Sequence, residues 1–337
     1  MTATLPSTLE RSRPLVEPAL RKALARLDPW SRHVATYHFG WCDADGRPTS
    51  GRGGKAVRPA LAVLAAESVG APVSAALPGA VAVELVHNFS LLHDDLMDRD
   101  VERRHRRTVW VIWGPATAIL AGDALLALAH EVLLESPASG AARAARLLAS
   151  ATRELTRGQV ADLAFETRDD VGLDECIDMA TAKTGSLLAA SAGIGALLAD
   201  APESTVDALM MFGREVGVAF QLVDDVLGIW GDPAVTGKPV HSDLRSRKKS
   251  LPVTWGVTRN DADPELRRWL SGPDEPSEES LPRVAELLDR AGARAWALAE
   301  ASVRMRLAEQ ALTQVDIKAE TRAELIELAH YVVDRSS

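Results

Sequence analysis

Two short stretches decide the fold of this 337-residue chain: FSLLHDDLMD, from Phe89 to Asp98, and AFQLVDDVLG, from Ala219 to Gly228. Both run an apolar segment with helical spacing into a pair of aspartates. Apolar stripes with the same spacing recur along the chain, whereas strand signals are scarce and hairpin turn pairs between alternating runs are absent. We therefore expect an all-α protein in which two of the helices face one cavity.

The composition fits a single, well-packed domain. Hydrophobic residues make up 47% of the chain and charged residues 25%, so a large core can be buried. The segment SGPDEPSEES, from Ser271 to Ser280, is acidic and lacks periodicity, but the helical pattern resumes after it without a change in style. We expect it to be a surface loop inside one domain that spans residues 1–337.

Charge and cysteine content narrow the function. A formal net charge of −9 argues against a nucleic-acid partner, which needs basic residues to neutralise phosphates broadly, but it leaves room for a local basic pocket. The two cysteines, Cys42 and Cys176, lie far apart and show no metal-type spacing. We therefore expect neither a disulfide framework nor a zinc site.

Membrane and export signals are weak. The N-terminal residues MTATLPSTLERSRP lack the apolar core of a signal peptide. The longest smooth apolar run, from Gly185 to Ala199, is shorter than the roughly 20 residues that span a bilayer, and it is rich in small residues. We expect a soluble, cytoplasmic protein without a transmembrane segment.

The first acidic motif has the geometry of a metal site. On a helix, Asp94 and Asp98 share one face, with Asp95 one step round. Like charges placed in this way repel one another, and a hard divalent cation would compensate them. Carboxylate oxygens are the ligands that Mg²⁺ accepts, with water and phosphate filling its remaining positions. The motif predicts Mg²⁺ binding, although a lone DDxxD is common on exposed helix ends.

The second acidic motif strengthens this interpretation. Gln221, Asp224 and Asp225 lie at i, i+3 and i+4, again on one face of a helix. Basic residues follow each of the two motifs in the chain. Two acidic helix ends with cations nearby indicate an anionic substrate that is activated by a metal.

The basic residues form a matching set. Lys55 and Arg58 lie three apart at an expected helix start, where backbone N–H groups also favour an anion. Arg103 and Arg104 follow the first acidic motif, and an arginine can hold phosphate oxygens in a bidentate fork. Further candidates are Lys183, Lys238 and Lys248. Carboxylates for a metal and cations for phosphate point to a diphosphate substrate.

From about Gly53 to Pro252 the chain resembles the trans-isoprenyl diphosphate synthases, or polyprenyl synthetases, in motifs that follow the order of that family. These motifs are GGKAVRP, ELVHNFSLLHDDLMD, RR, RGQVADL, KTG, FQLVDDVLGIWGD, TGK and SDLRSRKKSLP. The resemblance implies an all-α bundle of long helices around a deep central cavity, Mg²⁺ as the cofactor and usually a homodimer.

The resemblance also implies a reaction. An allylic diphosphate (dimethylallyl, geranyl or farnesyl) loses pyrophosphate, the double bond of isopentenyl diphosphate attacks the allylic cation, and a proton is removed. The product is a short-chain all-trans prenyl diphosphate. Mg²⁺ with Lys and Arg side chains would stabilise the charge on the leaving group.

By resemblance, each candidate residue has a role. The carboxylates that would hold Mg²⁺ are Asp94, Asp95, Asp98, Asp224 and Asp225. The cations that would contact the allylic diphosphate are Arg103, Lys183, Lys238 and Lys248. The residues that would hold isopentenyl diphosphate are Lys55, Arg58, His87 and Arg104. The oxygens that would face the developing cation belong to Lys183, Thr184 and Gln221, while the residues that would orient nearby helices or metal-bound water are Gln159 and Asp162.

One position departs from the family pattern in a way that matters. Gly228 replaces the last aspartate of the second acidic motif, which leaves that motif two carboxylates. Asp232 and Asp243 are close enough in sequence to compensate. Among the members of this motif, Asp224 is the most secure metal ligand.

Two residues of the first motif bear on product length. One helical turn is roughly 5.4 Å, so Phe89 and Ser90 sit about a turn deeper in the cavity than Asp94. A bulky Phe89 should block a growing chain, whereas a small Ser90 should not. By resemblance, this pattern is typical of enzymes that make geranylgeranyl diphosphate, with farnesyl diphosphate as the alternative; if Phe89 is ordinary core, it says nothing about length.

Two other functions remain open from the sequence. A class I terpene cyclase shares the helical fold and an acidic motif but needs no second diphosphate site, so the residues assigned to isopentenyl diphosphate favour a synthase. A non-catalytic helical partner subunit would be expected to lose one acidic motif. Gly228 is the one feature in favour of that reading.

Overall fold

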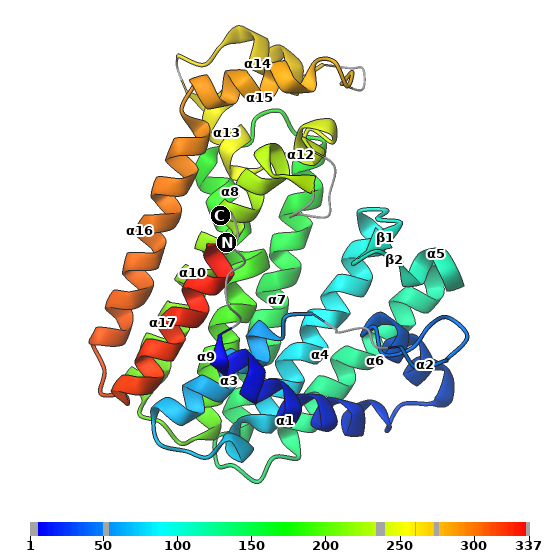
Figure 1. Ribbon diagram of the computed structural model, residues 1–337, viewed down its shortest axis with the longest axis vertical. Coiled ribbons are helices and arrows are strands. Elements are labelled where there is room, and N and C mark those ends of the chain that lie inside the picture. The colour runs from blue at the N-terminus through cyan, green and yellow to red at the C-terminus, as the bar shows by residue number, and fades with distance from the viewer. Residues whose placement is uncertain (1–5, 50–53, 234–239, 260, 273–275, 335–337) are drawn as a thin grey trace.

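The structure is a computed structural model that describes residues 6–49, 54–233, 240–259, 261–272 and 276–334. It confirms the all-α expectation, because helices form nearly all of its regular structure (Figure 1). The strands in the described residues are β1 (Glu102–Arg103) and β2 (Arg106–Arg107), which pair as a small antiparallel hairpin. Both cysteines are buried, and they form no disulfide with each other.

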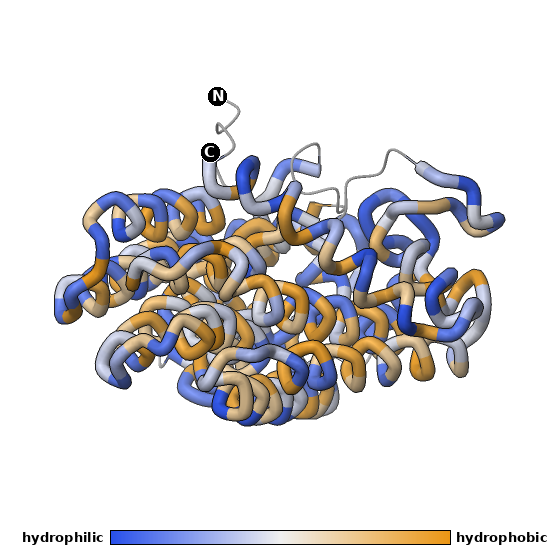
Figure 2. Tube along the Cα trace, turned by 90° about the horizontal axis from the view of Figure 1, so that it is seen from below, coloured by the Kyte–Doolittle hydropathy of each residue, from blue (hydrophilic) through white to orange (hydrophobic). Residues whose placement is uncertain are grey.

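The bundle is built from long helices. Those of the N-terminal half are α1 (Ser7–Leu24), α2 (Pro29–His38), α3 (Val57–Ser68), α4 (Val73–Met97), α5 (Val109–Trp113), α6 (Pro115–Leu134) and α7 (Ala141–Glu166). The centre of the chain forms α8 (Leu173–Ala180), the π-helix η1 (Thr181–Gly185), α9 (Ser186–Leu198) and α10 (Glu203–Trp230). Figure 2, which looks along the bundle, shows hydrophobic and hydrophilic residues alternating around these helices.

The apolar run from Gly185 to Ala199 forms the central helix α9, and every residue from Leu187 to Leu198 is buried. This helix packs against α3, α4, α7 and α10. Small residues let the backbones approach closely: a Cβ added at Gly195 would lie 2.0 Å from the carbonyl oxygen of Ala62 on α3. The small residues of this run therefore serve helix packing in the core.

A second hydrophobic cluster caps one end of the bundle (Figure 1). It involves α12 (Ser242–Arg245), α13 (Leu251–Thr258), α14 (Pro264–Leu270) and α15 (Leu281–Arg290). Trp230 at the end of α10 packs against both clusters, and α16 (Ala293–Thr313) packs against α10, α13 and α15. The described parts of the Ser271–Ser280 segment are non-helical, as expected for a loop. The chain ends in α17 (Ala319–Val333).

Two helices are long and apolar enough to cross a membrane, a possibility that the sequence expectation overlooked. The most apolar window of α4 is 72% buried in the bundle, as befits a core helix. The corresponding window of α6 is only 39% buried, and Leu120 on this helix is 66% exposed. The apolar face of α6 therefore lacks cover from the described part of its own chain.

Candidate active site

The first acidic motif occupies the last turn of α4. Asp94 lies in this turn and Asp98 caps it. Burial raises the pKa of Asp94 to about 6, with Lys183 opposing the shift and Asp98 adding to it. Burial raises the pKa of Asp98 as well, and Lys183 again opposes it. Two carboxylates that resist ionisation beside each other form a pair that a cation would stabilise.

Lys183 joins this motif to α7. Its Nζ lies 2.6 Å from Oδ2 of Asp162 on α7. Burial favours the neutral form of Asp162, but Lys183 and Lys248 outweigh it and lower the pKa of this carboxyl. Gly158 makes the approach possible, because a Cβ there would lie 2.3 Å from the backbone nitrogen of Lys183. Asp162, which the sequence assigned only an orienting role, therefore holds Lys183 in place.

A π-helix presents Lys183 and Thr184 to α10. The π-helix, η1, interrupts the α-helical register between α8 and α9, and π-bulges of this kind are frequent at functional sites. Thr184 Oγ1 donates a hydrogen bond to Gln221 Oε1 at 2.8 Å. The three residues expected to face the developing cation are thus brought together from two segments.

The second acidic motif lies near the end of α10. Asp225 is almost fully buried: its Oδ1 accepts from Gln221 Nε2 at 2.8 Å and its Oδ2 from the backbone N–H of Leu251 at 2.9 Å. Burial raises the pKa of Asp225 to about 7 despite the neighbouring Lys248. Asp224 is half-buried and also attracts Lys248. The two aspartates therefore have different surroundings, with Asp225 turned towards the protein.

Lys248 links the two acidic motifs. Burial alone would lower its pKa, but four carboxylates raise it, so the ammonium stays charged. In order of strength, these carboxylates belong to Asp243, Asp225, Asp162 and Asp224. Lys248 also attracts Asp98 of the first motif. The partly buried Lys248 thus lies among carboxylates from α4, α7, α10 and α12.

The side chain of Asp243 fills the space beside Gly228. A Cβ added at Gly228 would lie 2.5 Å from the carboxylate of Asp243, so the two positions share one volume. Ser242 Oγ bridges them, lying 3.2 Å from the carbonyl oxygen of Gly228 and 3.3 Å from Asp243 Oδ1. Asp232, the other candidate to compensate, is exposed. The Asp243 carboxylate therefore lies where a side chain at position 228 would begin.

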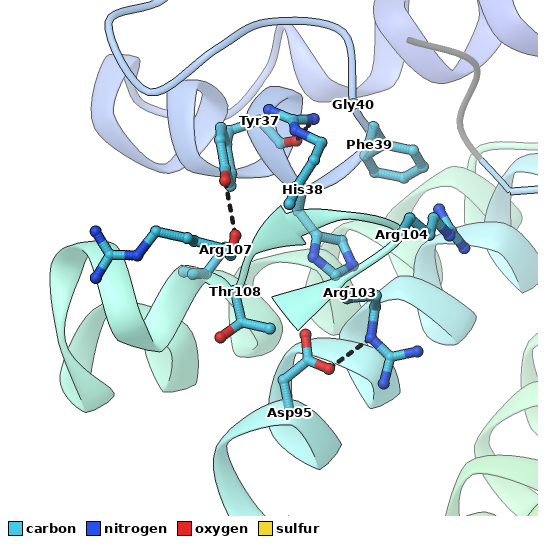
Figure 3. Close-up of a pocket in the computed structure, with 11 residues that line it drawn as sticks. Tyr37, His38, Phe39, Gly40, Asp95, Arg103, Arg104, Arg107 and Thr108 are labelled. Atoms are coloured by element: carbon cyan, nitrogen blue, oxygen red, sulfur yellow. Dashed lines mark hydrogen bonds and ion pairs between the residues drawn. The ribbon is translucent and has the colours of Figure 1, made fainter. Parts of the chain in front are cut away.

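Asp95 is buried and pairs with an arginine. Its side chain is 2% exposed, and Oδ1 accepts a hydrogen bond from Arg103 Nε at 2.5 Å. Figure 3 shows this pair at the edge of a pocket of about 280 Å³, where the hydroxyl of Tyr37 also donates to the carbonyl oxygen of Arg107. The predicted role of Asp95 as a metal ligand remains a prediction, and the structure gives this carboxylate an arginine partner.

A basic group surrounds the start of α3. Lys55 Nζ lies 5.1 Å from the centre of the Tyr331 ring. Arg104 lies against Gly54, where an added Cβ would be 2.7 Å from its Nη2. Arg13 on α1 donates to the carbonyl oxygen of Gly54 at 2.9 Å. Sequence reasoning missed Arg13, because it lies in an N-terminal segment without a recognisable motif.

A buried acid lies beneath this basic group. Glu84 is 6% exposed and accepts a hydrogen bond from Asn88 Nδ2 at 3.2 Å. Burial raises its pKa, although Arg58, Arg104 and Arg13 all oppose the shift. Glu84 was also missed, because nothing in the sequence distinguishes a buried glutamate from an exposed one on the same helix.

The remaining predicted residues are placed as follows. Burial and the nearby arginines hold the pKa of His87 well below its usual value, so its ring is neutral. Gln159 is buried, and neither of its amide atoms has a partner within the described residues. Phe89 and Ser90 are buried in α4, with Ser90 Oγ donating to the carbonyl oxygen of His87. Lys238 lies outside the described residues.

The described residues suit Mg²⁺, whose remaining positions are filled by water and substrate phosphate, better than they suit a metal that is held by protein side chains alone. In the described ranges no three His, Cys, Asp or Glu side chains are grouped closely enough to hold a metal by themselves. Mg²⁺ is usually bound through one or two carboxylates together with water and substrate phosphate. Burial disfavours the ionised forms of Asp94 and Asp98 and so raises the pKa of each, and an incoming cation would favour the ionised carboxylates.

Comparison with known proteins gives a consistent result. Residues 41–288 match the family model described as polyprenyl synthetase. The chain is 55% identical to (2E,6E)-farnesyl diphosphate synthase of Mycobacterium tuberculosis, over 99% of this chain and 94% of that protein. It is 43% identical to geranylgeranyl diphosphate synthase of the same organism, over 84% and 82%. A polyprenyl synthetase of Streptomyces coelicolor has the same fold, with a TM-score of 0.92, 52% identity and coverage of 98% and 100%.

Mg²⁺ should stabilise the protein more in mildly alkaline than in acidic solution. The pKa of Asp94 is raised to about 6. Between about pH 4 and about pH 6 the folded state therefore keeps a proton on this carboxyl that the unfolded chain has lost. The free energy of unfolding contributed by Asp94 therefore falls as pH rises from about 4 to about 6, and stays low above that. Mg²⁺ replaces the proton, so we expect saturating Mg²⁺ to raise Tm by about 4 °C at about pH 8 and by less than half of that at about pH 5.

Two variants make this measurement specific. Asp94→Asn should remove most of the difference between the two pH values, whereas Asp207→Asn, an exposed carboxylate on α10, should preserve it. Thermal unfolding with and without Mg²⁺ measures both. Equal Mg²⁺ effects at the two pH values in the wild-type protein would contradict the assignment of Asp94.

Proposed function

Because the chain belongs to the polyprenyl synthetase family and is a prenyltransferase of the farnesyl or geranylgeranyl diphosphate synthase type, we propose that it condenses isopentenyl diphosphate with an allylic diphosphate to make farnesyl diphosphate. The observation that carries this proposal is the placement of Lys183 and Lys248 among the carboxylates of both acidic motifs. Such an array suits a diphosphate that is clamped between metal and cations.

The product assignment departs from the first choice made on the sequence alone. Phe89 favoured geranylgeranyl diphosphate, with farnesyl diphosphate as the alternative. The relative named as a farnesyl diphosphate synthase is 55% identical over nearly the whole chain, against 43% over a shorter part for the geranylgeranyl diphosphate synthase. This difference supports the fifteen-carbon product.

Aspartates and lysines would bind the allylic diphosphate at the end of the site where its C–O bond breaks. Asp94, Asp98 and Asp224 would hold Mg²⁺, which, when bound, neutralises charge on the departing diphosphate. Lys183 would turn from Asp162 towards the allylic diphosphate, and Lys248 already faces the carboxylates of both motifs. Arg103 and Lys238 would complete this end of the site.

The opposite end would bind isopentenyl diphosphate. Lys55, Arg58 and Arg104 would bind its phosphates, and neutral His87 would donate a hydrogen bond without adding charge. A second cationic group of this kind distinguishes a condensing enzyme from a terpene cyclase. Two retained acidic motifs likewise disfavour a non-catalytic subunit.

The developing allylic cation would meet oxygens that are fixed by hydrogen bonds. The hydroxyl of Thr184 donates a hydrogen bond to Gln221 Oε1, so the lone pairs of the hydroxyl oxygen remain available to a positive charge. Gln221 is fixed in turn because its Nε2 donates to Asp225. Asp225 thus orients the amide, and its carboxylate is used for positioning rather than left free for a metal.

The length of the product tests the proposed activity. Purified protein with Mg²⁺, isopentenyl diphosphate and geranyl diphosphate should give mainly the fifteen-carbon product, read by mass spectrometry. If Phe89 closes the cavity, Phe89→Ala should raise the share of products of twenty carbons or more by about tenfold. Absence of condensation with every allylic primer, in folded protein, would refute the proposed activity; an unchanged product range in Phe89→Ala would refute only the role of Phe89.

The carboxylate of Asp243 can be tested as a ligand of Mg²⁺. We propose that it serves as the missing third carboxylate of the second motif, because it fills the space beside Gly228. Asp243→Asn should weaken Mg²⁺ binding by about tenfold, measured as the Mg²⁺ concentration that half-saturates the rise in Tm. Asp232→Asn, a neighbouring exposed carboxylate, should leave that concentration unchanged.

A swap of the two positions tests the same idea sterically. Gly228→Asp alone should lower Tm, because its Cβ would lie 2.5 Å from the Asp243 carboxylate. Adding Asp243→Gly should recover both Tm and Mg²⁺ affinity. If the double variant binds Mg²⁺ no better than Asp243→Asn, the two positions are not interchangeable and the proposal fails.

We also propose that the protein is a cytoplasmic homodimer that pairs through α6. This helix exposes Ile119, Leu120 and Leu134, an apolar face that the described part of the chain leaves uncovered. Exposed apolar patches of this kind mark protein or membrane contacts. A second copy covers such a face in a soluble enzyme, as the family resemblance implies.

Leu120→Glu should therefore weaken the dimer by about a hundredfold, because it places a charge in the centre of the contact. Light scattering during size-exclusion chromatography, without detergent, measures the mass. Val160→Glu, at an equally exposed position on α7, should remain dimeric. A monomeric wild-type protein, or one that needs detergent to stay in solution, would refute the proposed dimer.

A further inference from the structure

We propose that His93 determines product length by holding the ring of Phe89 in place, and that it anchors this ring to α6. The inference rests on the proposed role of Phe89 as the end of the elongation cavity. Nothing in the acidic motif requires a histidine immediately before its first aspartate. The contacts of His93 supply a reason for it.

The first contact joins two residues of one helix. Phe89 and His93 are four residues apart on α4, so their side chains meet on one face. Their ring centres are 4.8 Å apart and their planes are inclined at 69°, an edge-to-face arrangement. Such ring pairs attract one another beyond the effect of their buried area, which favours one side-chain rotamer. The orientation of Phe89 therefore depends on the position of the His93 ring.

The second contact fixes His93 to the neighbouring helix. Its Nε2 lies 3.1 Å from the carbonyl oxygen of Ile119, in the first turns of α6. The ring also lies directly on Gly122: a Cβ added there would be 2.3 Å from Nε2 and 2.5 Å from Cδ2. A glycine inside a helix is less favourable than an alanine, so its presence here has a packing reason. Gly122 provides the space in which His93 lies.

These contacts form a chain from α6 to the cavity. The carbonyl oxygen of Ile119 and the space at Gly122 fix the position of the His93 ring. The His93 ring in turn fixes the orientation of Phe89, and Phe89 meets the growing prenyl chain. The same helix carries the exposed apolar face at Leu120. Without the His93 ring, Phe89 loses its edge contact and gains free volume towards α6, into which it can rotate. The cavity would then admit a longer chain although Phe89 itself is unchanged.

The test is a double-mutant cycle read by product length. Phe89→Ala, His93→Ala and the double variant are assayed at equal substrate conversion. We expect His93→Ala to raise the share of products of twenty carbons or more by about fivefold, less than Phe89→Ala does. We expect the double variant to match Phe89→Ala, because His93 acts only through Phe89.

Further variants separate the ring from its anchor. His93→Phe keeps a ring beside Phe89 and should retain the wild-type product, whereas His93→Gln keeps a hydrogen-bond donor without a ring and should behave like His93→Ala. His130 lies on α6 about two helical turns beyond Gly122. His130→Ala is the control and should not change product length. If Gly122→Ala folds, it should lengthen the product by displacing the ring.

The outcomes distinguish this inference from the proposed function. Longer products from Phe89→Ala but not from His93→Ala would overturn the role of His93 and leave that of Phe89 intact. No lengthening from Phe89→Ala would overturn both roles while leaving the condensing activity unaffected. A double variant that makes much longer products than Phe89→Ala would show that His93 acts independently, which also overturns the inference.

Discussion

Repulsion between the carboxylates of the two acidic motifs is the constraint on which the rest of this structure depends. Asp94, Asp224 and Asp243 are partly buried and Asp98 is exposed, and within the described residues Lys183 and Lys248 attract members of this group. Partial burial strengthens these interactions, because the interior screens charge poorly. The fold must therefore hold Lys183 and Lys248 in fixed places, and it does so with the ion pair to Asp162 and with the turn of chain after α12.

The sequence predicts those parts of the site that local geometry determines. Residues four apart on a helix share a face wherever the helix lies, so the common face of Asp94 and Asp98 follows from their spacing, and their role as metal ligands stays a prediction. The pairing of Thr184 with Gln221 follows only through the family resemblance. The pairing of Asp95 with Arg103 required the position of Arg103 in a hairpin, which no helical pattern encodes.

Tertiary contacts explain what the sequence did not predict. Arg13 and Glu84 reach the basic group only because α1 and α4 pack beside the start of α3. Asp243 follows Gly228 by fifteen positions, and only the turn into α12 brings its carboxylate into the space that a larger residue at Gly228 would fill. The exposed face of α6 was missed because its apolar residues read as core. A pattern of apolar residues does not distinguish a helix that is covered by its own chain from one that is not.

The π-helix between α8 and α9 has a consequence for the tolerance of this chain to insertion and deletion. A π-helical turn contains one residue more than an α-helical turn, and each α-helical residue turns the chain by about 100°. Removing one residue from η1 would give a continuous helix with better backbone hydrogen bonds, yet it would rotate Lys183 and Thr184 relative to α9. Such a shortened chain would gain local stability and lose the shared orientation of the two side chains. Selection for stability alone would therefore work against this segment, and its irregular turn is retained at the expense of a more regular helix.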